Sequence, residues 1–159
     1  DLVSAAALID LVDDAWLAGL VGAVEAAGAA LVVTGSVDGR VQWEPVHPAD
    51  GDMAAAYARH QAGDKGFGAA LGTAAPARLA ERLEAVGRRV TLARGDWNRI
   101  GDPALQRAYL AGVVDALAEH GVDADALTAW KGFRLDAIET AASRLTVGHV
   151  DLFAAPREA

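Results

Sequence analysis

Apolar and polar positions divide the chain into short continuous apolar runs and longer amphipathic segments. The first run, residues 2–8, is typical of a strand buried on both faces, and residues 29–34, 89–94 and 145–154 are predicted to form further strands. The longer segments carry apolar residues at helical spacing, and they cover residues 13–28, 50–61, 76–87, 103–121 and 125–142. Strands that alternate with helices in this way predict an α/β sheet with helices on both faces.

Local signals indicate where several of these segments begin and end. Asp13 and Asp14 are both suited to cap the first helix, and Asp102 is suited to cap the helix that starts at residue 103. Gly132 predicts an interruption of the last helix. Glycine at both ends of residues 35–39 predicts a loop, and residues 41–43 predict a short additional strand.

The composition restricts the class of protein. The 159 residues suit one domain over residues 1–159, and 53% hydrophobic residues suffice for a core. No apolar stretch reaches membrane-spanning length, and no secretory leader is visible. Cysteine is absent, which excludes disulfides, thiolate metal ligands and a cysteine nucleophile, and which fits a cytoplasmic protein.

The net charge and the mean hydropathy indicate which kinds of partner the chain can bind. The formal net charge of -8 argues against a nucleic-acid partner, because that affinity rests on lysine and arginine neutralising phosphates. A mean hydropathy of +0.19 indicates that some apolar surface contacts a partner or a missing segment. The first residue is Asp1 rather than methionine, so either the chain was processed or it begins inside a longer one.

Four segments together resemble the second half of class I S-adenosylmethionine-dependent methyltransferases. DLVSAAALIDLVDDAWL, which opens the chain, resembles the fourth strand of that family and the helix after it. Residues 28–36 resemble the fifth strand, RRVTLARGDW after Gly87 resembles the sixth, and residues 144–156 resemble the seventh. In that family the seventh strand is antiparallel and lies between the fifth and sixth. The resemblance therefore implies a partial Rossmann-like methyltransferase sheet, and HQAGDKGFGAALG at residues 60–72 is similar to a subset of bacterial small-molecule enzymes.

The resemblance implies S-adenosylmethionine as the cofactor and a small molecule as the substrate. The family builds its cofactor site on the first three strands, from a glycine-rich turn and an acidic residue. Neither is present, since Gly66, Gly68 and Gly72 lack the G-x-G-x-x-G spacing and follow a helix. We expect that the N-terminal cofactor half is absent from this chain, and that the chain alone binds the cofactor weakly or not at all.

The stretch after the first strand is the strongest candidate for the reaction site. The resemblance places cofactor contacts at Ala6, Ala7 and Leu11, and a contact near the transferred methyl at Asp10. Ala6 stands where the family often has a polar residue, so only its backbone can hydrogen-bond. Asp10 either accepts a proton or orients an amine, or it is a polar residue that begins the next helix.

Substrate contacts are expected at the carboxyl ends of the later strands and in the glycine-rich loop, because open α/β sheets bind ligands at those strand ends. The candidates are Ser36, Asp38, Arg40, Trp97, His60, Asp64, Lys65 and Phe67. A continuous helix would put His60 and Asp64 on one face, which suits a base with its orienting group or a pair of metal ligands, but Gly63 is expected to end the helix between them. The alternatives are a substrate lid formed by His60, Asp64, Lys65 and Phe67, or a solvated helix end with a flexible glycine turn. No third ligand lies at short spacing, so no metal is expected. His149 is expected to be a hydrogen-bonded core histidine.

Two functions remain open. In the first, the complete protein is an enzyme that methylates a small molecule. In the second, the chain is a non-enzymatic, truncated module that binds a protein partner or itself through the exposed edge of its sheet. The G-x-S-x-G, P-loop and H-E-x-x-H motifs are all absent, so hydrolase, phosphoryl-transfer and zincin functions have no support.

Overall fold

A computed structural model describes residues 1–64, 66 and 68–157. The chain folds into two compact units. Unit 1 comprises Asp1–Asp38, Gln61–Asp96 and Gly148–Ala159, and unit 2 comprises Gly39–His60 and Trp97–Val147. The assignment of residues 1–159 to a single domain stays a prediction.

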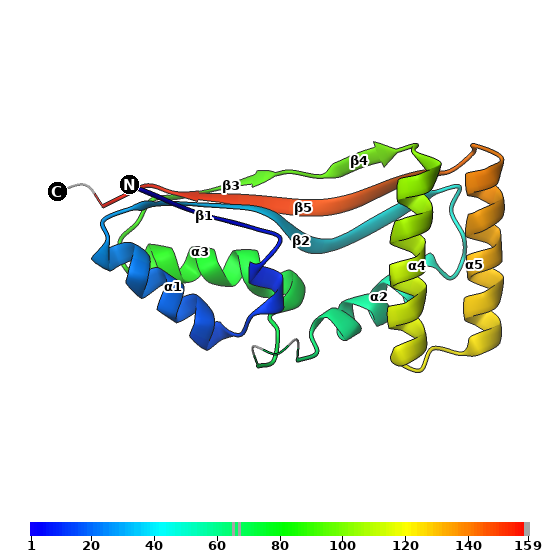
Figure 1. The fold of residues 1–159 in the computed structure, drawn as a ribbon, viewed down its shortest axis with the longest axis horizontal. Coiled ribbons are helices and arrows are strands. Elements are labelled where there is room, and N and C mark those ends of the chain that lie inside the picture. Colours follow the sequence, from blue (N-terminus) through cyan, green and yellow to red (C-terminus); the bar gives the residue numbers. More distant parts are fainter. Residues whose placement is uncertain (65, 67, 158–159) are drawn as a thin grey trace. The chain divides into compact units, whose positions relative to one another are not determined.

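A mixed sheet contains all the strands of the described chain. Its order is β1 (Leu2–Ala6), β2 (Ala30–Glu44), β5 (Arg144–Ala154) and β3 (Val90–Arg94), and β4 (Trp97–Ile100) also pairs with β5 (Figure 1). β1 is parallel to β2, whereas β5 is antiparallel to both β3 and β4. This confirms the predicted α/β class, with an antiparallel last strand between the second and third strands of the prediction. The arrangement is that of a partial Rossmann-like sheet.

In unit 1, two helices cover one face of the sheet. α1 (Asp14–Ala26) and α3 (Ala75–Ala85) lie on the same side of the strands in Figure 1. Their buried apolar side chains share one core with those of the strands, including Leu17, Leu79, Leu31 and Leu152. Asp13 caps α1 as predicted, because its carboxylate accepts a hydrogen bond from the Trp16 backbone N–H at 2.8 Å. The 3₁₀ turn η1 (Ile9–Leu11) lies between β1 and α1, and a second one, η2 (Gly72–Ala74), directly precedes α3.

The other face of this part of the sheet is more exposed than predicted. Val3 of β1 packs against the core, so its neighbour Leu2 points to the opposite face, where it is 63% exposed. Phe153 alternates in the same way with the buried Leu152 and is 45% exposed. The prediction that the first strand is buried on both faces is therefore wrong. In the described part of this unit, α1 and α3 both pack on the same face of the sheet, so helices do not cover both of its faces.

In unit 2, three helices and parts of three strands enclose a second core. α2 (Asp50–Gln61), α4 (Pro103–Glu119) and α5 (Ala124–Glu139) supply most of it, and α4 lies beside α5. Its buried side chains include Trp43, Leu110, Leu117, Trp130 and Leu145. None of the helices in the described residues is long and apolar enough to cross a membrane.

The structure corrects three predicted elements. β2 continues through residues 35–39, so the loop expected there and the separate strand at residues 41–43 are parts of one strand. Gly35 and Gly39 adopt φ values of +67° and +85°, which a strand accommodates as local irregularities rather than as its end. Trp97 lies in a strand, β4, instead of the expected loop, and α5 passes through Gly132 without interruption.

Candidate functional site

In unit 1, β1 leaves the sheet beside the middle of β2. The Ala7 N–H donates to the Thr34 carbonyl at 3.0 Å, and Ala7 then turns the chain with a φ of +48°. A Cβ on Gly35 would lie 3.8 Å from the Ala7 nitrogen, so the next residues of β2 begin directly beside this turn. Asp10 follows in η1 and Ser36 follows in β2. Asp10 therefore follows the end of β1 as predicted, whereas Ser36, which was expected after the end of the second strand, lies within β2.

Asp10 and Ser36 both carry buried oxygen atoms without a hydrogen-bond partner in the described part of the chain. These atoms are Oδ1 of Asp10 and Oγ of Ser36, and the Ser36 residue is completely buried. Burial raises the pKa of the Asp10 carboxyl, against the lowering effects of a backbone hydrogen bond and of the His149 charge. Because buried polar atoms in proteins normally have a partner, two orphan oxygens indicate a place where a ligand can supply hydrogen bonds.

His149 belongs to the same unit and acts electrostatically on Asp10. It is 4% exposed in β5, as expected for a core histidine. Its backbone N–H donates to Asp96 Oδ1 at 3.1 Å, and its carbonyl accepts from the Gly95 N–H at 3.1 Å. A polar residue inside a buried strand already indicates from the sequence that a hydrogen-bond partner is needed.

The carboxylate of Asp151, in β5, contacts β2 on one side and the residues after β3 on the other. Asp151 Oδ1 accepts a hydrogen bond from the Gly35 N–H at 2.9 Å. A Cβ on Gly95 would lie 2.6 Å from Asp151 Oδ2, so a glycine is required for this approach. β2, β5 and the residues after β3 are thereby held together where Asp10, Ser36 and His149 occur.

The remaining candidates of unit 1 differ in what they can contribute. Ala6 ends β1, the Ala7 N–H is already bonded to Thr34, and Leu11 is exposed at the end of η1. Asp38 lies further along β2 and forms an interaction of its own. Asp64 Oδ1 accepts from the Gly66 N–H at 2.7 Å in a local turn. Lys65 and Phe67 lie outside the described residues.

Three candidates fall in unit 2. Arg40 lies in β2, and Trp97 is 47% exposed on β4, where it pairs with Val147. His60 Nδ1 is 4.0 Å from Glu119 Oε2, and its ring stacks on Tyr57 with a centroid distance of 6.5 Å. α2 ends at Gln61, as predicted, so no continuous helix puts His60 and Asp64 on one face. Within the described ranges, no three metal-ligating side chains come together.

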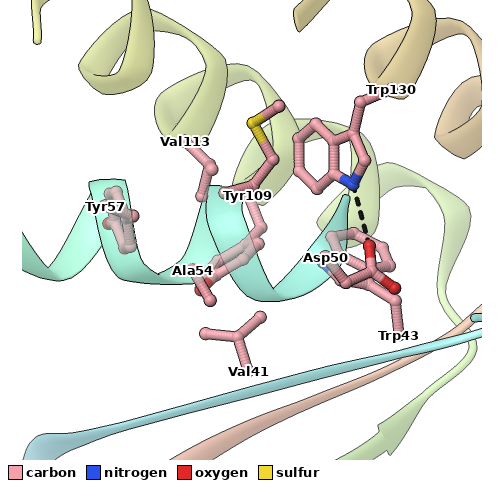
Figure 2. A pocket seen from close by; sticks show the side chains of 9 residues that line it. Val41, Trp43, Asp50, Ala54, Tyr57, Tyr109, Val113 and Trp130 are labelled. Atoms are coloured by element: carbon pink, nitrogen blue, oxygen red, sulfur yellow. Dashed lines mark hydrogen bonds between the residues drawn. The ribbon is translucent and has the colours of Figure 1, made fainter. Parts of the chain in front are cut away.

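Unit 2 also contains an aromatic pocket that sequence reasoning missed. Figure 2 shows its lining side chains from β2, α2, α4 and α5, among them Trp43, Tyr57, Tyr109 and Trp130. The Trp43 and Trp130 rings meet edge to face at 6.5 Å, and Tyr109 is tilted against Trp43 at 6.2 Å. Burial, followed by the nearby Tyr57, raises the pKa of Tyr109, so its phenol stays neutral.

The charges of this pocket neutralise each other. Asp50 accepts hydrogen bonds from Trp130 Nε1 at 2.8 Å and from the buried Arg134 guanidinium. Burial alone would raise the pKa of Asp50, but these bonds and one from the His47 N–H lower it. Arg134 also lies over the Trp43 and Trp130 rings at 5.3 and 5.8 Å. The cavity itself is about 10 Å³, which is room for about one water molecule. It is therefore a packed aromatic cluster rather than a ligand site of ordinary size.

Comparisons with known proteins add little to this geometry. No protein family and no curated protein matches the chain. A solved structure, a cyclopropane-fatty-acyl-phospholipid synthase-like protein from Lactobacillus casei, is similar with a TM-score of 0.48 and 19% identity. The similarity covers 96% of this chain and 55% of that one, so this chain spans about half the length of the protein it resembles. At that level the similarity assigns neither a family nor an activity.

Proposed function

We propose that this chain is the substrate-side half of an S-adenosylmethionine-dependent methyltransferase that acts on a small molecule. The observation that carries the proposal is the sheet order, in which an antiparallel last strand lies between β2 and β3. This is the order that the sequence resemblance implies. The carboxyl end of β1 supports the site at Asp10, because open α/β sheets bind ligands at such strand ends. Ser36 lies within β2, two residues after Thr34, which pairs with the last residue of β1.

Asp10 is the group that we assign to the methyl acceptor. Methyl transfer depends mainly on alignment of the acceptor with the donor, since the sulfonium supplies a reactive methyl group when it is bound. The unpartnered Oδ1 of Asp10 is suited to accept a hydrogen bond from the acceptor and to take its proton. Burial supports this role, because a carboxylate whose pKa is raised is a stronger base than an ordinary one.

The cofactor contacts assigned to this chain are few. Ala6 and Leu11 offer apolar surface, and the Ala7 N–H is used by Thr34. These three residues supply one wall for the cofactor and no polar side chain to hold it. We therefore expect little or no binding of S-adenosylmethionine to the 159 residues alone, measured by titration calorimetry. An affinity on the order of micromolar or better would contradict this expectation.

The activity is tested on the gene product that contains this chain, with labelled S-adenosylmethionine and a panel of bacterial small metabolites. Asp10→Asn keeps the shape of the side chain but not its basicity, so turnover should fall by roughly 100-fold or more while KM changes less. Asp115→Asn is the matched control, because Asp115 is an exposed aspartate in the middle of α4. Transfer to no member of the panel, or equal loss in the two variants, would count against the proposal.

Self-association is a second candidate function, favoured by the edge of β1. In the described sheet β1 pairs with β2 alone, and Leu2 on this edge strand is 63% exposed. We propose that two copies associate through this edge. Sedimentation should show a species that grows with concentration and is lost in Leu2→Lys but kept in Leu105→Lys, which changes an exposed leucine of α4. A monomer at every concentration would refute it.

A further inference from the structure

Three arginines of unit 1 lie close together beside the start of β3, and two of them line a cavity. The cavity measures about 310 Å³, and the described residues that line it are Gly87, Arg89, Pro156 and Arg157. None of these four carries an acidic side chain. The third arginine, Arg88, lies between Gly87 and Arg89 in the chain and is buried. A cavity of this size is at the lower end of the range for small-molecule sites.

Two contacts bring the cavity arginines together, although they are far apart in the chain. The Ala155 N–H donates to the Arg89 carbonyl at 3.2 Å, which places the residue after β5 beside the segment that enters β3. A Cβ on Gly87 would lie 4.0 Å from Arg157 Nε, so the Arg157 side chain extends over Gly87. Arg89 and Arg157 therefore reach one cavity from two segments that are held against each other.

The carboxylate of Glu25 is shared by two of the three arginines. Its Oε1 accepts from Arg88 Nε, and its Oε2 is 3.7 Å from Arg157 Nη1. Because one carboxylate carries a single negative charge, these two guanidinium groups keep an excess positive charge. Arg89 adds a third guanidinium at the cavity and also forms an interaction of its own. In a chain with a formal net charge of -8, excess positive charge beside a cavity indicates an anionic ligand.

We propose that this cavity binds a phosphate group, either as the free ion or as a phosphate monoester. The inference goes beyond the proposed function, because the cavity is in another part of unit 1. Arg88 donates to the Ala29 carbonyl at 2.6 Å, directly before β2 begins, whereas Asp10 follows the carboxyl end of β1. Since β1 and β2 are parallel, these are opposite ends of the two strands. The anion site is therefore separate from the site assigned to methyl transfer.

Two guanidinium groups at one cavity favour phosphate over a carboxylate. A guanidinium presents parallel N–H donors, which bind two oxygens at once. A carboxylate has two oxygens, so one such bidentate contact already occupies both. A phosphate monoester has three free oxygens, so it accepts from two guanidinium groups at the same time. Arg89 and Arg157, which come from different segments, therefore match a phosphate group better than a carboxylate.

The site is tested by titrating the 159-residue chain with inorganic phosphate at constant ionic strength, followed by amide NMR signals. The signals of Gly87 and Arg89 should shift and saturate at millimolar phosphate, whereas that of Asp10 should not move. Arg89→Gln and Arg157→Gln should each weaken binding by roughly 10-fold or more, because each removes charge-assisted hydrogen bonds. Arg107→Gln, which changes an exposed arginine of α4, should bind like the original chain. Shifts that do not saturate, or equal binding by the three variants, would overturn the site.

The ligand class is tested with acetate and phenyl phosphate under the same conditions. Acetate should bind roughly 10-fold more weakly than phosphate, and equal affinity of the two would overturn the choice of phosphate. Tighter binding of phenyl phosphate supports a monoester as the ligand, and tighter binding of inorganic phosphate supports the free ion. Arg89 and Arg157 are exposed, so their variants should keep the circular dichroism spectrum of the original chain. Neither titration involves methyl transfer, so its result is independent of the proposed function.

Discussion

Substitution of Arg88 tests how much its buried hydrogen bonds contribute to the stability of unit 1. The side chain is 1% exposed and makes four hydrogen bonds within this unit. It donates to the Ala29 carbonyl at 2.6 Å, the Val24 carbonyl at 3.1 Å and the Ala155 carbonyl at 3.3 Å, and its Nε donates to the Glu25 carboxylate. One guanidinium thus joins the end of α1, the start of β2 and the segment after β5.

Arg88→Met keeps most of the apolar stem and removes every donor. Glu25 loses a buried partner, and the Ala29 and Val24 carbonyls lose bonds that are themselves buried. Removing one partner of a buried ion pair costs about 3–5 kcal/mol, and this range already includes such unsatisfied groups. For a chain of this size, each kcal/mol lowers Tm by about 2–4 °C, so we expect a decrease of roughly 6–20 °C.

The measurement is urea denaturation followed by circular dichroism, together with a thermal scan. Arg89→Met is the control, because Arg89 is the exposed neighbour on the same segment, and substitutions at such sites usually stay within about 0.5 kcal/mol. A loss below about 1 kcal/mol for Arg88→Met would refute the reasoning, because it would mean that water satisfies the three carbonyls at little cost.

Three further predictions follow from single positions. Gly68→Ala should destabilise the fold by about 1–3 kcal/mol in urea titration, since Gly68 has a φ of +84° and a Cβ there would lie 2.6 Å from Asp13 Oδ2; Gly51→Ala, which meets no atom within 4 Å, should be neutral or better. Because the folded-state pKa of Asp10 is raised above 3.8, its contribution to stability should be complete below pH 3.8 and be lost as pH rises through the folded value; a pH series of unfolding free energies should show this component vanish in Asp10→Asn. Tyr109 has a pKa raised above 10.0, so its contribution should be lost only at strongly alkaline pH, and Tyr109→Phe should remove the late step from an ultraviolet titration of the folded chain.

Elements with local signals could be predicted from the sequence. α2 occupies the predicted residues 50–61, and α4 begins after the predicted cap Asp102, whose carboxylate accepts from the Ala104 N–H at 2.8 Å. These positions depend on residues three or four apart, which a sequence displays directly. The continuity of β2 depends instead on its neighbour β5, far away in the chain, and the glycines at positions 35 and 39 resembled a loop.

The candidate site, like the fold, could be predicted from the sequence only in part. Asp10 and Ser36 were predicted because each was expected to follow a strand, and the carboxyl ends of parallel strands share one edge of a sheet. Asp10 does follow β1, whereas Ser36 lies within β2. The hydrogen bond from the His149 N–H to Asp96 was not predictable, since it depends on which strand lies beside which. A pairing of His60 with Asp64 on one helix face would need a continuous helix, and α2 ends at the predicted Gln61.

The position of Asp151 between two glycines limits how this protein can vary. Its Oδ1 needs the Gly35 N–H in a left-handed conformation, and its Oδ2 occupies the space that a side chain at position 95 would need. A substitution at position 95 is then tolerated only after Asp151 has become smaller, and a smaller residue there leaves the Gly35 amide unsatisfied. The three positions are expected to change together over evolutionary time, and random mutagenesis should recover double replacements there more readily than single ones.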